Sequence, residues 1–136
     1  MATAGRRPYG SFNFSVTFAP GRRQPIGFSE VVFPALPACA RSELPPDVPP
    51  PALLLKRGFD GTLDLYQWWD QVRRSRRSRP RTVTVALLDE TLARAVVRWT
   101  FTGCRPLRLG YSRLDANASA VLIESLELSF EDVEIA

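Results

Sequence analysis

The stretch "TVTVALLDETLARAVVRWTF", residues 82–101, contains two segments in which every second side chain is apolar. A period of two, in segments rich in β-branched and aromatic residues, is typical of half-buried strands. The short polar sequence "DET" between them has the composition of a turn. The stretch therefore predicts a β-hairpin, and this hairpin sets the class of the whole fold.

Further strands are expected on both sides of this hairpin. "FNFSVTF" (residues 12–18) alternates most clearly, and "IGFSEVV" (residues 26–32) is expected to pair back on it. The other expected strands are "ALLLKR" (52–57), "LRLGY" (107–111) and "VLIESLELSF" (121–130). The apolar phase changes within the last of these, which predicts a bulge or a twist near Glu124.

One segment, "LDLYQWWDQV" (residues 63–72), has helical instead of strand periodicity. Its apolar side chains recur at i, i+3, i+4 and i+7, which predicts one buried helical face. The residues predicted to form this helix core are Leu65, Trp68, Trp69 and Val72. Thr62 precedes the segment and is the predicted N-cap.

The predicted fold class is mainly β: an antiparallel β-barrel or sandwich of about six to seven strands with one packed α-helix. The 136 residues suit a single domain, residues 1–136. Residues 34–51 hold seven of the twelve prolines, so residues 33–51 are predicted to form a proline-rich surface loop. This loop is either a stiff connector or a docking segment for a partner.

Several classes of function find no support in the composition. The chain contains no histidine, which excludes Ser-His-Asp and Cys-His catalytic arrangements, and it has no glycine-rich nucleotide-binding motif. Cys39 and Cys104 have no CxxC spacing and are expected to be reduced and unliganded. The sequence therefore predicts no catalytic residue, no metal site, no cofactor, no small-molecule substrate and no membrane span.

An arginine run, "QVRRSRRSRPR", follows the predicted helix at residues 71–81. It contributes +6 to a net charge of +4, so the rest of the chain sums to −2 and the basic character is local. The run is either a solvated loop or a contact for an acidic partner, and its members are Arg73, Arg74, Arg76, Arg77, Arg79 and Arg81. Specific nucleic-acid binding is not predicted, because the run has no interleaved aromatic platform. The alternative from another class is a basic β-barrel that binds nucleic acid as a monomer.

The order of these segments resembles the tail-tube protein family of contractile phages, which includes the inner-tube proteins of extracellular contractile injection systems. The resemblance rests on a succession of motifs covering nearly the whole chain apart from residues 32–51. These are "YGSFNFSV" (9–16), "GFSEV" (27–31), "LLLKRGFDGTLDLYQWWDQVR" (53–73), "RTVTVALLDE" (81–90), "VVRWTFTGCRPLRL" (96–109) and "LDANASAVLIESLELSFEDVE" (114–134).

The resemblance implies a structural subunit, not an enzyme. Members of the family form hexameric rings that stack into a conduit, so the expected partners are further copies of the chain and related tube, sheath or baseplate subunits. Such a protein is cytoplasmic when synthesised and then becomes part of a phage tail or injection-system particle. Glu124, Glu127 and Glu131 are candidate contacts with basic groups of a neighbour. A specialised tube paralogue at the baseplate or tip is the alternative within the family.

Overall fold

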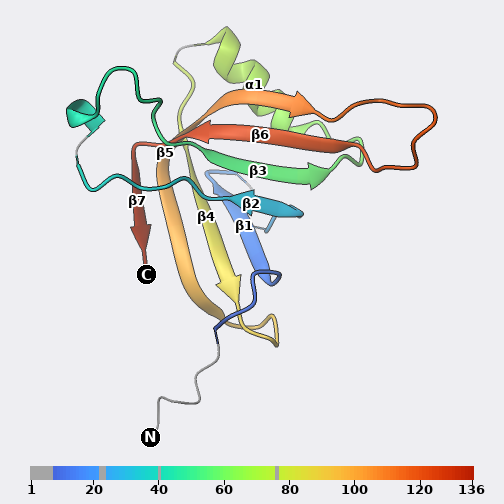
Figure 1. Ribbon diagram of the computed structural model, residues 1–136, viewed down its shortest axis with the longest axis horizontal. Coiled ribbons are helices and arrows are strands. Elements are labelled where there is room, and N and C mark those ends of the chain that lie inside the picture. Colours follow the sequence, from blue (N-terminus) through green and yellow to red (C-terminus); the bar gives the residue numbers. More distant parts are fainter. Residues whose placement is uncertain (1–7, 22–23, 40, 76) are drawn as a thin grey trace, which may run out of the picture.

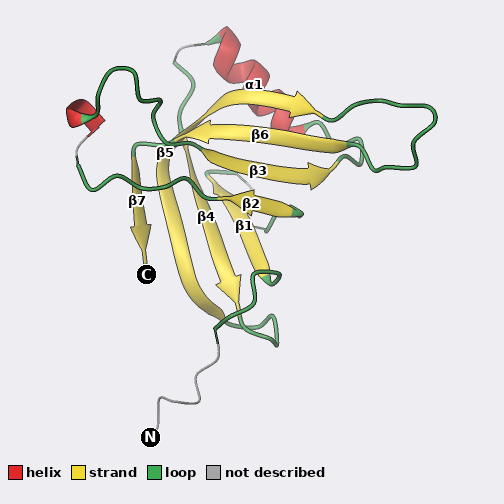
Figure 2. Cartoon of the chain, viewed as in Figure 1, coloured by secondary structure: helices red, strands yellow, loops and turns green. Residues whose placement is uncertain are grey.

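The computed structural model describes residues 8–21, 24–39, 41–75 and 77–136. Within these residues the chain forms β-strands and one α-helix (Figures 1 and 2). The strands are β1 (Phe14–Ala19), β2 (Glu30–Val32), β3 (Leu53–Gly58), β4 (Arg81–Leu88), β5 (Ala95–Tyr111), β6 (Ile123–Ser129) and β7 (Asp132–Ile135). The helix is α1 (Asp64–Arg74), and the predicted hairpin is β4–β5.

The strands form an antiparallel sheet with the order β1-β4-β5-β6-β3-β2, and β7 also pairs with β5. The first half of β5 pairs with β4 and β7, whereas its second half pairs with β6. Figure 1 shows the two groups running in different directions, with β1, β4 and β7 crossing the direction of β2, β3 and β6. The sheet is not closed into a barrel in the described part of the chain, and the fold is sandwich-like.

The long strand β5 passes from one half of the sandwich to the other because two irregularities bend it. Gly103 has a φ of 67° at a register shift opposite β4, a backbone conformation that glycine adopts without penalty. Pro106 lies at a second shift opposite β6, where the lost amide donor is tolerated. The two strands predicted at residues 95–101 and 107–111 are therefore parts of one strand.

The core lies between the two halves of the sheet and under α1. Its fully buried side chains come from β1, β3, β4, β5, β6 and the helix: Val16, Leu53, Leu55, Leu65, Trp68, Val83, Val85, Phe101, Leu126 and Leu128. The ring of Trp68 lies 5.4 Å from that of Phe18, which fixes the helix against β1. This burial supplies the main stabilisation of the fold, at about 25 cal/mol per Å² of apolar surface.

Two local predictions were wrong, and one alternative of a third does not hold. Thr62 is not the N-cap: the cap residue is Leu63, which makes no side-chain cap hydrogen bond. Residues 26–32 do not form a strand along β1; only the Val16–Ile26 bridge joins them, and β2 pairs with β3 instead. Of the bulge or twist predicted near Glu124, the bulge is absent from β6, because the register of β6 with β3 is continuous.

The proline-rich loop connects β2 to β3 and passes beside β7 (Figure 1). Its described residues include a 3-10 turn at Arg41–Glu43 and a turn closed by the hydrogen bond from the Val48 amide to the Pro45 carbonyl oxygen, and they are otherwise irregular. Phe33, at its start, places its ring 4.8 Å from the ring of Trp99 on β5. The loop is therefore anchored on the sheet at this end by aromatic packing.

Candidate assembly interface

The four side chains predicted for the helix core divide into two groups. Leu65 and Trp68 are 1% and 2% exposed, respectively. Val72 is half-buried and packs against the same core. Trp69 is half-buried as well, but its ring lies 6.0 Å from the ring of Tyr66 and 4.8 Å from the Arg73 guanidinium. Trp69 thus lies at the edge of the core, with the Arg73 guanidinium over its ring.

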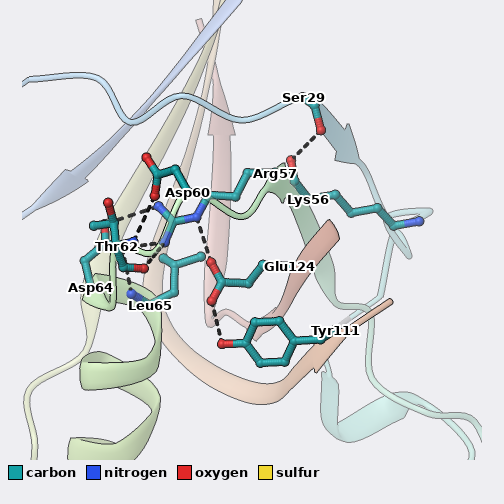
Figure 3. Close-up of polar contacts among 9 residues, drawn as sticks. All are labelled: Ser29, Lys56, Arg57, Asp60, Thr62, Asp64, Leu65, Tyr111 and Glu124. Carbon is teal, nitrogen blue, oxygen red and sulfur yellow. Dashed lines mark hydrogen bonds and ion pairs between the residues drawn. The ribbon is translucent and has the colours of Figure 1, made fainter. Parts of the chain in front are cut away.

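A buried ionic network connects the start of the helix to the sheet (Figure 3). Arg57 on β3 donates from Nε to Glu124 Oε1 on β6 at 2.7 Å. Its Nη2 donates to Asp64 Oδ1, at the first position of α1, and to the Thr62 carbonyl oxygen. Tyr111, the last residue of β5, donates its hydroxyl to Glu124 Oε2 at 2.7 Å. Four elements therefore meet at one guanidinium and one carboxylate.

The centre of the network, the Arg57–Glu124 pair, is removed from water, whereas Asp64 is half-buried and Tyr111 is exposed at its rim. Glu124 is fully buried and Arg57 is 6% exposed, so each needs the other for compensation. Burial disfavours ionisation of Asp64, but the hydrogen bond and charge of Arg57 outweigh it and lower the pKa of that carboxyl. For Tyr111, burial followed by the hydrogen bond to Glu124 raises the pKa to about 12.

Replacing Tyr111→Phe is expected to destabilise the protein by about 1–2 kcal/mol at pH 7, because Glu124 loses a donor. Since the phenol pKa is raised on folding, its contribution is present below pH 10 and is lost as the pH rises toward 12. Urea unfolding of both proteins at pH 7 and pH 11.5 measures the difference. An equal difference at both pH values would contradict this assignment.

The three glutamates predicted as contacts lie in different environments. For Glu124 the prediction was wrong: its side chain is buried and bonded to Arg57 and Tyr111 of the same chain, so it cannot meet a neighbour. Glu127 is half-buried on the opposite face of β6, with Oε2 3.8 Å from Arg108 Nε. Glu131 is exposed between β6 and β7. Only Glu127 and Glu131 remain as candidate contacts.

The arginines of the run also differ in their surroundings. Arg73 and Arg74 both pair with the Asp70 carboxylate on the helix. Arg81, on β4, is half-buried with its guanidinium 4.8 Å from the ring of Trp68. Arg77 and Arg79 are exposed in the loop between α1 and β4. Arg76 lies outside the described residues.

In the described part of the chain, β1 and β7 are the two margins of the half of the sheet formed by β1, β4, β5 and β7, and each has an edge without a full ladder. A third such edge belongs to β2, which ends the other half and pairs only with β3. Among the described residues, β7 pairs with β5 on one side and has no ladder partner on the other. β1 pairs with β4, and its other side makes only the Val16–Ile26 bridge. Exposed strand edges are templates for pairing with another chain, and soluble proteins usually cover them. The margins formed by β1 and β7 are therefore candidate assembly surfaces.

The sequence profile of the T4-like virus tail tube protein gp19 family matches residues 40–134, which is more than half of the chain. The chain belongs to this family. It is thus a structural tail tube protein and a component of a phage tail or injection-system particle. No curated protein matches the sequence closely enough to add a second line of comparison.

Solved structures share the fold of this tail tube protein. A chain in the anti-feeding prophage baseplate, symmetrised six-fold, is 24% identical with a TM-score of 0.71, and the match covers 96% of this chain and 97% of that one. A chain in the sheath-tube complex of the PVC extracellular contractile injection system is 15% identical with a TM-score of 0.77, over 100% and 98% of the two chains. A chain in the PVC sheath/tube terminator is 16% identical with a TM-score of 0.80, over 98% and 99%.

The described residues of the tail tube protein show no other prepared chemical site. They contain no group of three or more Cys, Asp or Glu side chains arranged to hold a metal ion. None of their helices has the length and hydropathy needed to cross a bilayer. Cys39 is exposed and Cys104 is buried, and both are free thiols. Burial raises the pKa of the Cys104 thiol to about 12, which makes it a poor nucleophile.

Proposed function

We propose that this tail tube protein forms hexameric rings in which β7 of each copy pairs with β1 of the next, and that the rings stack into a conduit. The observation that carries the proposal is the pair of free edges, those of β1 and β7, at the two margins of the β1-β4-β5-β7 half of the sheet. A head-to-tail contact between two different margins closes into a ring when the rotation per copy fits. Closure pairs the β1 and β7 edges and removes the liability of these two exposed strands.

The strand directions support this pairing. β4 and β7 both run away from the end of the sheet at which β1 stops, whereas β1 and β5 run toward it. Placing β7 beside the β1 of a neighbour at the same level therefore continues the antiparallel alternation without a break. A cyclic ring keeps all copies at one level, so the same contact repeats around it.

The proposed role is mechanical and involves no catalytic step. The partners are further copies of the chain, together with tube, sheath or baseplate subunits of the same particle. The higher identity to the baseplate chain, 24% against 15% for the sheath-tube complex, favours a second placement in a layer near the baseplate. A main tube subunit would build long tubes by itself, whereas a protein of a special layer would stop at single rings.

Light scattering after size exclusion, over a range of concentrations, tests the proposal. A ring of six copies has a mass of about 91 kDa, six times the 15.2 kDa of one chain. Negative-stain images of the same fractions separate rings from tubes. A mass of one chain at every concentration would overturn the proposal of self-assembled rings, although it would leave the family membership intact.

A further inference from the structure

Two segments of opposite charge dominate the electrostatics of the chain. Residues 71–81 hold six arginines and no acid, whereas residues 114–136 hold six acids and no Lys or Arg. Such a separation within one small protein gives two surfaces that attract each other between copies. Whether they meet between copies depends on where the fold places the exposed members of the two segments.

The strand register places both at the same end of the sheet. Phe18, Val83, Phe101 and Val133 form one row across β1, β4, β5 and β7. Beyond this row, β4 begins at Arg81, the last residue of the arginine run and two positions before Val83, and β7 begins at Asp132, one position before Val133. The basic group therefore lies toward the β1 margin, and the acidic group lies at the opposite, β7 margin of the same end.

The basic group consists of Arg77 and Arg79, here called the basic loop. Both are exposed, and neither forms an ion pair within the described residues. The loop is fixed in place, because Arg105 on β5 donates from Nη1 to the Ser78 carbonyl oxygen at 2.7 Å. Unlike Arg73 and Arg74, which share Asp70, these two arginines have no local partner that explains them.

The acidic group consists of Glu131 and Asp132, here called the acidic corner. Both are exposed, and no ion pair involves them in the described part of the chain. Glu131 lies against Gly103, where an added β-carbon would come within 2.6 Å of its side chain. The Glu131 amide also donates to the Thr102 carbonyl oxygen at 2.8 Å. The corner is thus held beside β5, at the start of β7.

We infer that the acidic corner of one copy binds the basic loop of the next copy, so that charge pairing sets the register of the ring. The inference rests on the proposed ring and names the residues of its contact. In an uninterrupted sheet the neighbour's β1 lies between the two groups, so β7 and the start of β4 are about 10 Å apart, two strand spacings. The basic loop directly precedes the start of β4, and we expect the long side chains of its two arginines to span this gap.

The test uses the full chain and paired charge reversals. The loop variant carries Arg77→Glu and Arg79→Glu, and the corner variant carries Glu131→Lys and Asp132→Lys. Each variant alone places like charges across the contact, so the fraction of chain in rings should fall about tenfold or more at low salt. An equimolar mixture should recover rings, because loop and corner variants alternate with opposite charges across every contact of an even-numbered ring.

A control matched to the loop variant carries Arg94→Glu and Arg113→Glu. These make the same change of net charge as the loop variant, at exposed positions away from both groups. It should form rings like the parent protein, and circular dichroism checks that each variant is folded. Rings formed by the loop variant alone, or no recovery on mixing, would overturn the inference while the proposed function stands. Loss of co-purified nucleic acid with rings intact would assign the basic loop to nucleic acid instead. A parent protein without rings would overturn both proposals.

Discussion

Replacing Arg57→Ala is expected to lower the free energy of unfolding by about 3–5 kcal/mol, because it leaves the carboxylate of Glu124 buried without its counter-charge. The same change removes the bond that fixes Asp64 at the start of α1. For a small domain with about 5–15 kcal/mol of total stability, this is a large fraction. Urea or thermal unfolding of the purified variant measures it.

Two comparisons make the Arg57 result specific to the buried pair. Lys56→Ala alters the residue that precedes Arg57 on β3, whose side chain forms no ion pair within the described residues. This change should leave stability nearly unchanged. A double variant with Arg57→Met and Glu124→Leu removes both charges and should be more stable than Arg57→Ala alone. If Arg57→Ala changed stability no more than Lys56→Ala, the network would have no structural role.

The second large effect is expected at Trp68. Trp68→Ala should destabilise the protein by about 3–5 kcal/mol, because it opens a cavity where the helix contacts Phe18 and the core. Trp69→Ala is the matched control from the same helix. Its half-buried ring contacts Tyr66 and Arg73, so its removal should cost less than half as much. Chemical unfolding of both variants compares the two losses of stability. Equal losses would contradict the assignment of Trp68, and not Trp69, to the core.

The regular alternation of the sequence predicted the β4–β5 hairpin, β1, β3 and β6, as well as the helix with its buried Leu65. These elements have strong local periodicity, and their burial follows the pattern. The single strand β5 was not predicted, because Gly103 and Pro106 are typical of strand ends. In the fold they occupy bulges, whose position depends on pairing with β4 and β6 and not on local sequence.

Two features of the candidate interface depend on contacts distant in the sequence. A glutamate on a strand is normally predicted to face solvent. Glu124 is buried because it pairs with Arg57, which is 67 residues away and cannot be placed beside it from the local sequence. The strand β7 was missed because its sequence "DVEI" is short and half acidic. Its assignment requires the continuous register along β5, which places it beyond the end of β6.

A map of the assembled particle by electron cryomicroscopy, at a resolution that separates strands, tests the central claim most directly. The expected result is a ring of six copies in which β7 of each copy lies antiparallel to β1 of the next, so that the β1-β4-β5-β7 half of the sheet continues around the ring. A particle in which the β7 margin faces solvent, or is covered by an element other than the neighbouring β1, would contradict it.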